Sequence, residues 1–269
     1  MKNWKKHITA NLQKLKAVIS FSILLFTVFF AACSTPTISS DDSDEKSSVE
    51  TAEQGEDLSF AVEQKEEMFN PDIDYGSMTD ERDGQVYRTV TIGDQVWMAE
   101  NLNYASAEGS SCNGNTAGGC ARYGRLYTWV AAVGKAESAC GEGHECDLGE
   151  GNVQGVCPEG WHLPTNPELK TLFNTVGGQT TAGKALKSQT GWYSSDDGTD
   201  AFGFSAVSAG GARNNKEDHN AYFWSSTEFG SNNGCRMTFY YNSSQYDKDA
   251  AYLGAHKKSL MSSVRCVKD

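Results

Sequence analysis

The stretch that decides the fold runs from residue 157 to residue 176, CPEGWHLPTNPELKTLFNTV, and joins a cysteine and a tryptophan to the clearest helix signal in the chain. Thr165 and Glu168 have the spacing of a capping box, in which each side chain satisfies a backbone N–H left free at the start of a helix. Pro167 falls in the first turn, where a missing N–H costs nothing. The sequence therefore predicts a helix that ends at Gly177 and buries one face, formed by residues at helical spacing: Leu169, Leu172, Phe173 and Val176.

A β-hairpin is predicted upstream of this helix. The runs 86–92 and 95–100 have the β-branched and aromatic composition of strands, and Gly93-Asp94 between them is a good two-residue turn. Trp97 and Met98 point to opposite faces of the second run, so we expect at least one of them in the core.

The remaining spacing predicts the fold class. Residues 126–133 show helical spacing up to Gly134, and residues 181–188 show a weaker helical pattern. After Trp192 the chain has short strand-like runs separated by Gly, Asn and Asp, at 202–207, 221–226, 236–241 and 263–268. Two or three helices followed by antiparallel strands predict an α+β domain over residues 81–269.

The N-terminus predicts export. Five lysines in residues 1–16 precede an apolar run, 17–32, that is shorter than the roughly 20 residues of a membrane-spanning helix, so residues 1–32 read as a cleaved signal peptide. Phe30-Ala31-Ala32-Cys33 resembles the lipobox of bacterial lipoproteins, with Cys33 as the lipid attachment site, and Ser34 resembles their outer-membrane sorting pattern. The alternative is an uncleaved anchor. In both cases we expect the folded part outside the cytoplasm at a membrane surface, on its outer or its periplasmic face.

Residues 33–80 are predicted to be a disordered, lipidated tether. Residues 34–80 hold 14 Asp and Glu against two Lys and few large apolar side chains, too few to offset the entropy of ordering. The tether accounts for most of the net charge of −12, so the domain after it is only mildly acidic. Nothing in the sequence favours a nucleic-acid partner, which would need a basic face, so we expect none.

The cysteines indicate disulfides in an oxidising compartment. Seven remain after Cys33, and in an exported protein they favour disulfides over metal ligands. We expect Cys112 with Cys120 and Cys140 with Cys146 as local bridges, Cys157 with Cys266 as a long-range bridge, and Cys235 left over, although spacing alone does not fix the connectivity. A zinc site from Cys140, His144 and Cys146 is the alternative, but the spacing matches no common zinc pattern.

Several strings together resemble one family. They occur in the family's order from about Glu81 to Asp269 and are similar to the Fibrobacter succinogenes major paralogous domain: DGQVYRTVTIGDQVWMAENLNY (83–104), YGRLYTW (123–129), GVCPEGWHLPT (155–165), GTDAFGFSA (198–206), AYFWSST (221–227) and SVRCVKD (263–269).

The resemblance implies a fold and a setting. Through WHLPT, FWSST and the VRCV ending, the family resembles the C-type-lectin-like fold that is shared with formylglycine-generating enzymes. That fold commonly bridges its first helix to its last strand, which adds support for Cys157 with Cys266. The family is found in sets of exported proteins, which implies surface display, and it has no established activity that could be assigned to particular residues.

Two candidate sites remain. Exposed aromatic rings near Gly, Asn and Asp loops could stack on a glycan: Trp192, Tyr193, Tyr240, Tyr241 and Tyr246. Asp196, Asp197 and Asp200 could bind calcium, although a solvated turn is the commoner role and Gly198 breaks the EF-hand pattern. The sugar-binding signatures of calcium-dependent lectins, Glu-Pro-Asn, Gln-Pro-Asp and Trp-Asn-Asp, are absent from the sequence.

The sequence favours binding over catalysis. It contains no HExxH, GxSxG or phosphate loop, and His162 between Trp161 and Leu163 is typical of a core histidine. We expect a lipoprotein that displays a ligand-binding module for a polysaccharide or an envelope protein, with no cofactor beyond a calcium ion. A structural or assembly component is the first alternative. An oxidase of the formylglycine-generating type is the second, and it would need Cys235 together with a further thiol.

Overall fold

The helix predicted after the WHLPT stretch is confirmed as α6 (Asn166–Thr175). In the computed structural model, which describes residues 58–211, 219–241 and 244–269, both halves of the capping box are present. The Thr165 hydroxyl accepts from the Glu168 N–H, and the Glu168 carboxylate accepts from the Thr165 N–H at 2.8 Å. Leu169, Leu172 and Phe173 are buried on the inner face, as the spacing predicts.

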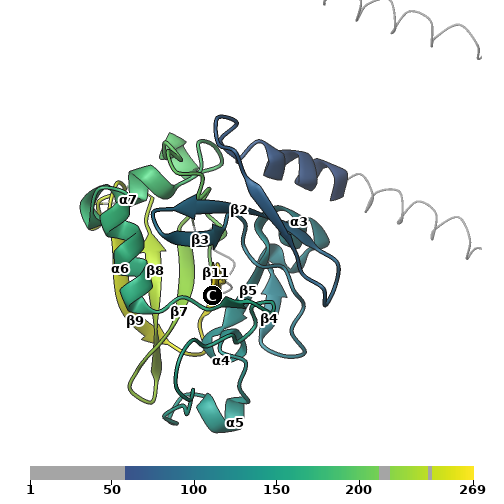
Figure 1. The fold of residues 1–269 in the computed structure, drawn as a ribbon, viewed down its shortest axis with the longest axis vertical. Helices are drawn as coiled ribbons and strands as arrows, with labels where there is room; N and C mark the ends of the chain where they lie inside the picture. Colours follow the sequence, from purple (N-terminus) through teal and green to yellow (C-terminus); the bar gives the residue numbers. More distant parts are fainter. Residues whose placement is uncertain (1–57, 212–218, 242–243) are drawn as a thin grey trace, which may run out of the picture. The chain divides into compact units, whose positions relative to one another are not determined.

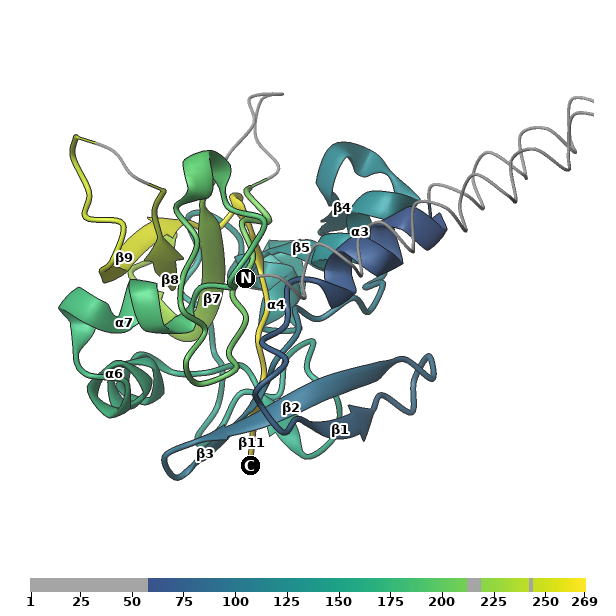
Figure 2. The same cartoon turned by 90° about the horizontal axis from the view of Figure 1, so that it is seen from above.

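The first sheet contains the predicted hairpin. Its order is β1-β2-β3-β11-β6, and β2 and β3 pair antiparallel with Ile92 opposite Gln95 on either side of the Gly93-Asp94 turn. Trp97 and Met98 are both fully buried. Figure 2 shows β1, β2 and β3 together on one side of the chain. The strands are β1 (Gly76–Thr79), β2 (Val86–Ile92), β3 (Gln95–Met98), β6 (Trp161–His162) and β11 (Val267–Lys268).

The second sheet has the order β4-β5-β10-β7-β8-β9. Long antiparallel ladders join β7 to β8 and β8 to β9. The pairing of β10 with β7 is parallel, with Ser263 opposite Phe223, so the prediction of antiparallel strands throughout is wrong at this position. The strands are β4 (Ser110–Cys112), β5 (Arg125–Thr128), β7 (Ala221–Phe229), β8 (Asn233–Phe239), β9 (Ala251–Lys257) and β10 (Met261–Ser263).

The described residues contain six α-helices, more than the two or three expected. One covers residues 58–66, and α6 and α7 lie beside the β7–β8–β9 part of the second sheet (Figure 1). The weak pattern at 181–188 is confirmed as a helix by α7. The others are α3 (Ala117–Tyr123), α4 (Trp129–Ala132), α5 (Glu137–Cys140) and α7 (Gln179–Leu186), and two 3-10 turns are η1 (Asn113–Asn115) and η2 (Tyr193–Ser195).

Two predicted elements are wrong for physical reasons. Residues 126–133 do not form one helix, because β5 takes Leu126 into a ladder between β4 and β10 and only α4 remains helical. Residues 202–207 do not form a strand, because Gly203 and Ser205 adopt positive φ angles that break an extended chain, and only Ala206 makes a bridge, to Lys187.

The three predicted disulfides are confirmed. Cys112 bonds Cys120, Cys140 bonds Cys146, and Cys157 bonds Cys266, while Cys235 is free and buried. The long-range bridge ties the segment before α6 to the turn between β10 and β11. The prediction of a mixed helix-and-sheet domain linked by disulfides therefore holds.

The predicted tether is too long. Residues 58–80 belong to the folded part: β1 pairs with β2, and Ala61, Met68 and Asp80 are buried. Composition misled the prediction because the rest of the chain supplies partners for the segment, as when Arg88 offsets the charge of Glu66 and Lys65 pairs with Glu100. The rest of the tether, the signal peptide and Cys33 lie outside the described residues. Among those residues, no helix has the length and apolar character that crossing a bilayer requires.

Candidate functional site

Six aromatic side chains gather beyond the end of β8. The antiparallel register sets Phe239 opposite Ala251 and Thr238 opposite Tyr252, so the residues that follow β8 lie beside the start of β9. We call this group the tyrosine cluster. It contains four of the five predicted aromatic residues and two that were not predicted: Tyr193, His219, Tyr240, Tyr241, Tyr246 and Tyr252.

The cluster consists of two stacks. In the Tyr240 stack, the rings of Tyr240 and Tyr246 are parallel with centroids 3.8 Å apart, and Tyr252 meets both edge-on at 5.3 Å. In the Tyr193 stack, the ring of Tyr193 lies 3.9 Å from that of His219, and Tyr241 meets both edge-on. Neighbouring side chains of an extended chain point to opposite sides, so Tyr240 and Tyr241 belong to different stacks.

The two stacks differ in exposure and charge behaviour. Tyr193 is 50% exposed, the largest exposed fraction of any ring in the cluster, although His219 stacks on one face of its ring. Tyr240 is half-buried, and burial together with the neighbouring Tyr246 raises the pKa of its phenol to about 12. The Tyr240 phenol is therefore a neutral hydrogen-bonding group at neutral pH, and the Tyr240 stack offers apolar faces with polar rims.

A buried lysine supports the cluster from behind. The Lys187 ammonium donates a 2.7 Å hydrogen bond to the Tyr240 carbonyl and lies 4.1 Å from the centre of the Trp192 ring. Burial lowers the pKa of Lys187 to about 8, against the opposing effect of Asp196. Lys187 therefore fixes the backbone from which Tyr240 projects.

The prediction that Trp192 contributes to a binding surface is wrong. Trp192 is only 6% exposed, and its indole N–H donates to the Ser188 hydroxyl and the Ala206 carbonyl. The ring belongs to the core that also contains Phe204 and Leu186.

Two of the three acidic residues of the predicted calcium site accept hydrogen bonds from the local backbone. Asp200 is fully buried and accepts from the Ser205 N–H and hydroxyl, and burial raises the pKa of its carboxyl to about 6. Asp197 accepts from the Trp192 N–H at 3.0 Å, and Asp196 is buried. In the described part of the chain, no group of three or more His, Cys, Asp or Glu residues could hold a metal ion, so these carboxylates form no common site there.

The described cysteines include one free thiol, which limits the redox chemistry that they could carry out. Cys235 lies in β8 opposite Ala255 and is 6% exposed. The six other cysteines of the described residues are in disulfides, so none of them supplies the second thiol that the oxidase hypothesis requires.

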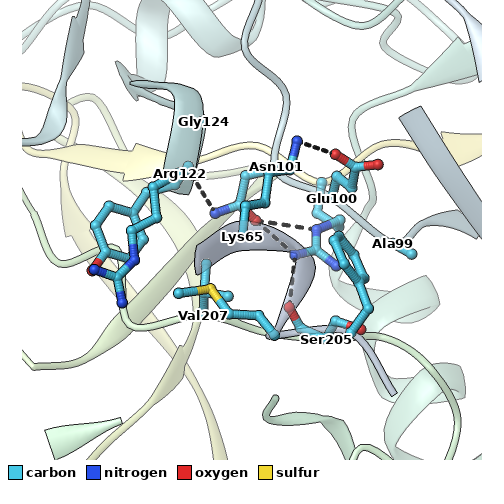
Figure 3. A pocket seen from close by; sticks show the side chains of 12 residues that line it. Lys65, Ala99, Glu100, Asn101, Arg122, Gly124, Ser205 and Val207 are labelled. Atoms are coloured by element: carbon cyan, nitrogen blue, oxygen red, sulfur yellow. Dashed lines mark hydrogen bonds and ion pairs between the residues drawn. The ribbon is translucent and has the colours of Figure 1, made fainter. Parts of the chain in front are cut away.

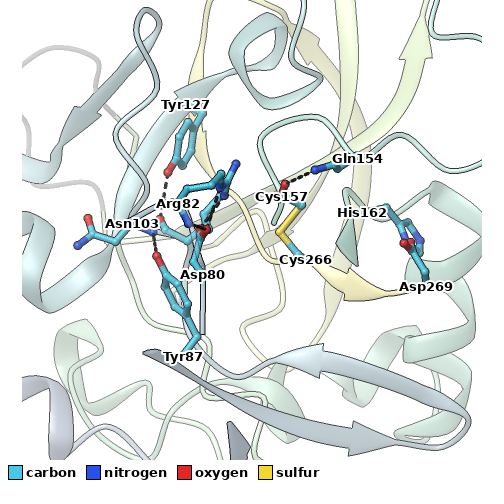
Figure 4. The surroundings of a disulfide bond; sticks show 11 residues. Asp80, Arg82, Tyr87, Asn103, Tyr127, Gln154, Cys157, His162, Cys266 and Asp269 are labelled. Carbon is cyan, nitrogen blue, oxygen red and sulfur yellow. Dashed lines mark hydrogen bonds and ion pairs between the residues drawn. A yellow bond between two sulfur atoms is a disulfide. The ribbon is translucent and has the colours of Figure 1, made fainter. Parts of the chain in front are cut away.

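His162 is the core histidine that the sequence predicts. Its ring is buried, Nε2 lies 2.8 Å from Glu168 Oε1, and Nδ1 lies 2.6 Å from Asp269 Oδ1. Burial lowers its pKa, but the hydrogen bonds to the two carboxylates outweigh this effect and raise the pKa above its usual value. Figure 4 shows His162 and Asp269 on one side of the Cys157–Cys266 bridge and, on the other, the ion pair of the buried Asp80 with Arg82. His162 thereby joins β6 to α6 through Glu168 and to the residue after β11 through Asp269.

A second polar group lies under residues 65–69. Figure 3 shows a pocket in which Lys65 reaches Glu100. Asn101 and the Ser205 carbonyl, which also line it, accept hydrogen bonds from the buried Arg265. The cavity volume is about 20 Å³, which is room for about one water molecule. This pocket is therefore filled by the chain itself.

The comparisons with known proteins give the chain a family. A family model described as the Fibrobacter succinogenes major domain matches residues 90–268. The chain belongs to this family. No curated protein and no solved structure matches the chain.

The Fibrobacter succinogenes major domain match contains most of the structure but not its beginning. It starts inside β2, so β1 and the helix at 58–66 precede it, although both pack on the domain. The whole tyrosine cluster lies within the match.

Three members of the site were missed by sequence reasoning. Tyr252 lies in β9, a strand that the sequence does not predict, His219 is in no predicted element, and Lys187 falls within the helix predicted at 181–188. The Gly, Asn and Asp residues near Tyr240 indicate a loop, and this signal identifies the region of the tyrosine cluster from the sequence. Nothing in the sequence indicates that a lysine is buried behind it.

Proposed function

We propose that this chain is an exported lipoprotein whose domain, of a C-type-lectin-like kind, binds a polysaccharide or a surface protein through the tyrosine cluster. The observation that carries the proposal is the pair of aromatic stacks at one end of the second sheet, one of which includes a half-exposed ring. The role is binding and requires no catalytic step.

The chemistry of the cluster supports this role. Flat aromatic faces contact the apolar faces of sugar rings, and phenol groups at their rim hydrogen-bond to hydroxyls. Edge-on contacts from Tyr252 and Tyr241 fix the stacked rings, so little side-chain entropy is lost on binding. A rigid stack is a better platform than a single mobile ring.

The signal peptide and lipobox supply the setting of the proposal. A lipid on Cys33 would hold the domain at the outer membrane, with the acidic residues 34–57 between the anchor and the folded part. Incorporation of labelled fatty acid tests the anchor. We expect label in the wild-type chain and none in Cys33→Ser, and label in both would show that Cys33 is not the attachment site.

Retention on insoluble material tests the binding site. The chain of residues 34–269 is incubated with cellulose, xylan and isolated cell envelopes, and bound protein is measured. We expect retention on at least one of them, with at least a tenfold weaker affinity for Tyr193→Ala or Tyr246→Ala, a loss of about 1.4 kcal/mol or more. Phe229→Ala is the matched control, because Phe229 is an exposed ring at the opposite end of the same ladder.

Two results would contradict the proposal. No retention on any of the three materials would disprove the hypothesis of ligand binding. Equal retention of the wild type and both tyrosine variants would show that the binding site is not the tyrosine cluster. Retention on envelopes alone, with crosslinks to fixed protein neighbours in intact cells, would replace ligand binding with the assembly role.

A further inference from the structure

The outer edge of β2 is only partly covered. β1 pairs with residues 86–89 of β2, from Thr79 opposite Val86 to Gly76 opposite Thr89. Residues 90–92 continue the strand and pair with β3 on the other side, but no described strand lies beside them on the β1 side. The edge is therefore open over three residues.

The register shows which backbone groups face this opening. Ile92 and Gln95 flank a two-residue turn, so they form a hydrogen-bonded pair, and such pairs alternate along an antiparallel ladder. Thr91 is then in the non-bonded position relative to β3. Its N–H and C=O point away from β3, in the same direction as the groups with which Thr89 meets Gly76.

A hollow lies directly beside these groups. Before Gly76 the chain leaves β2, because the Tyr75 hydroxyl bonds the Ser205 hydroxyl at 3.1 Å. The space between the diverging segments has a volume of about 390 Å³, within the range of ligand-binding pockets, roughly 300–1,000 Å³. Its lining comes from three segments: Ile73, Asp74, Gly76, Thr89, Val90, Thr91, Ala201 and Phe202.

We propose that this hollow binds an extended polypeptide segment of a partner protein, which pairs with Thr91 as a strand in line with β1. An extended backbone supplies one acceptor and one donor at the spacing that the Thr91 N–H and C=O require. Ile73 and Phe202 offer apolar contacts for its side chains. Asp74 is exposed and is the one charged residue in the lining, so the partner segment carries a cationic side chain there.

The site is independent of the tyrosine cluster. β2 belongs to the first sheet, whereas the cluster lies at the end of β8 and β9 in the second. Loss of either site leaves the residues of the other unchanged, so the two proposals fail separately.

The test uses the chain of residues 34–269, which keeps every described residue, and the synthetic peptide Lys-Thr-Val-Lys-Val-Thr-Lys. Binding is followed by NMR from the amide signals of residues 89–92. We expect saturable shifts at the Thr91 amide. A peptide with the same side chains but alternate N-methylated amides cannot form the ladder, and we expect at least tenfold weaker binding from it.

Protein variants separate backbone from side-chain contributions. Thr91→Pro removes the outward N–H at a position that makes no bond to β3, and we expect at least a tenfold weaker affinity. Thr91→Ala keeps the N–H and should bind within about twofold of the wild type. Asp74→Asn should weaken binding and reduce its salt dependence. Tyr193→Ala, in the other site, should leave peptide binding unchanged.

Several outcomes would overturn the proposal. One is no shift at Thr91 at millimolar peptide, and another is equal binding of the N-methylated peptide, which needs no variant protein and holds even if Thr91→Pro fails to fold. Binding of xylo-oligosaccharides in place of the peptide would assign the hollow to a glycan. A concentration-dependent dimer that Thr91→Pro abolishes, without peptide binding, would assign it to a second copy of the chain.

Discussion

Arg265 shows how much one side chain of the VRCV ending contributes. Its guanidinium is fully buried and donates to Asn101 Oδ1 and to the carbonyls of Met98 and Phe204, with the Phe204 ring 4.5 Å away. Burial lowers its pKa to about 9, so it stays charged at neutral pH. The charge is stabilised by carbonyl and amide oxygens, which ties the end of the chain to β3 and to the loop at 204–205.

His162 is expected to make stability depend on pH. Its folded-state pKa is raised by Glu168 and Asp269 beyond the opposing effect of burial, so its contribution is fully present below the unfolded value of about 6.5. That contribution is lost as pH rises through the folded-state pKa. Each pKa unit of difference corresponds to about 1.4 kcal/mol.

Urea unfolding at pH 5.5 and pH 8.5 measures this effect. We expect the free energy of unfolding of the wild type to fall relative to that of His162→Gln between these two values. Asp269→Asn should give an intermediate result because it removes one of the two carboxylates. An identical pH dependence in the wild type and His162→Gln would disprove the prediction.

The Cys235 thiol is expected not to react with thiol reagents while the chain is folded. It is the one free cysteine of the described residues and is 6% exposed, so a thiol reagent should not reach it in the native chain of residues 34–269. Under denaturing, non-reducing conditions we expect one thiol per chain, and none in Cys235→Ser. A count of zero or three would contradict the disulfide assignment.

At the scale of elements, the sequence predicts an element correctly where the residues that determine it lie close together in the chain. The capping box and the apolar spacing of α6 lie within about a dozen residues, and the Gly93-Asp94 turn specifies the β2–β3 register. The error at 126–133 has the opposite origin. Leu126 and Tyr127 become strand residues because β4 and β10, distant in the sequence, supply hydrogen bonds on both sides.

The three disulfides are expected to differ in their contribution to stability. In the chain-entropy model the contribution grows with the loop that is closed, from about 2 kcal/mol for the 6-residue separation of Cys140 and Cys146 to about 5 kcal/mol for the 109 residues between Cys157 and Cys266. Denaturant unfolding of the two double alanine variants tests this order. Equal losses, or a larger loss at Cys140 and Cys146, would show that native-state packing outweighs chain entropy.

At the scale of the whole molecule, the folded part begins before the family match. The segment 58–69 contacts the domain through Met68, the Lys65–Glu100 pair and the Arg88–Glu66 pair, and the Arg88 guanidinium lies 4.1 Å from the Phe69 ring centre. Without this segment, Glu100 would lose its lysine partner while β1 would be absent from the first sheet.

Truncation measures this contribution. A chain that starts at residue 81 should be less stable than one that starts at residue 48 by at least about 3 kcal/mol, because it loses the burial of Met68 and removes the Lys65 ammonium from the buried Glu100 carboxylate. For a domain of this size we expect a midpoint of thermal unfolding lower by roughly 6–12 °C. Equal midpoints would show that residues 58–80 do not contribute to the stability of the domain.

The sequence by itself determined the mixed fold class, the α6 helix and the β2–β3 hairpin, because capping and turn chemistry act over short distances, and cysteine usage indicated disulfides whose connectivity the structure then fixed. It also located the region of the tyrosine cluster through Tyr240, Tyr241 and Tyr246. Only the tertiary structure decided that Trp192 is core, that Tyr252 and His219 complete the stacks, and that Lys187 lies behind them. Those facts depend on which distant segments become neighbours, and burial and pairing between such segments are set by the packing of the whole chain.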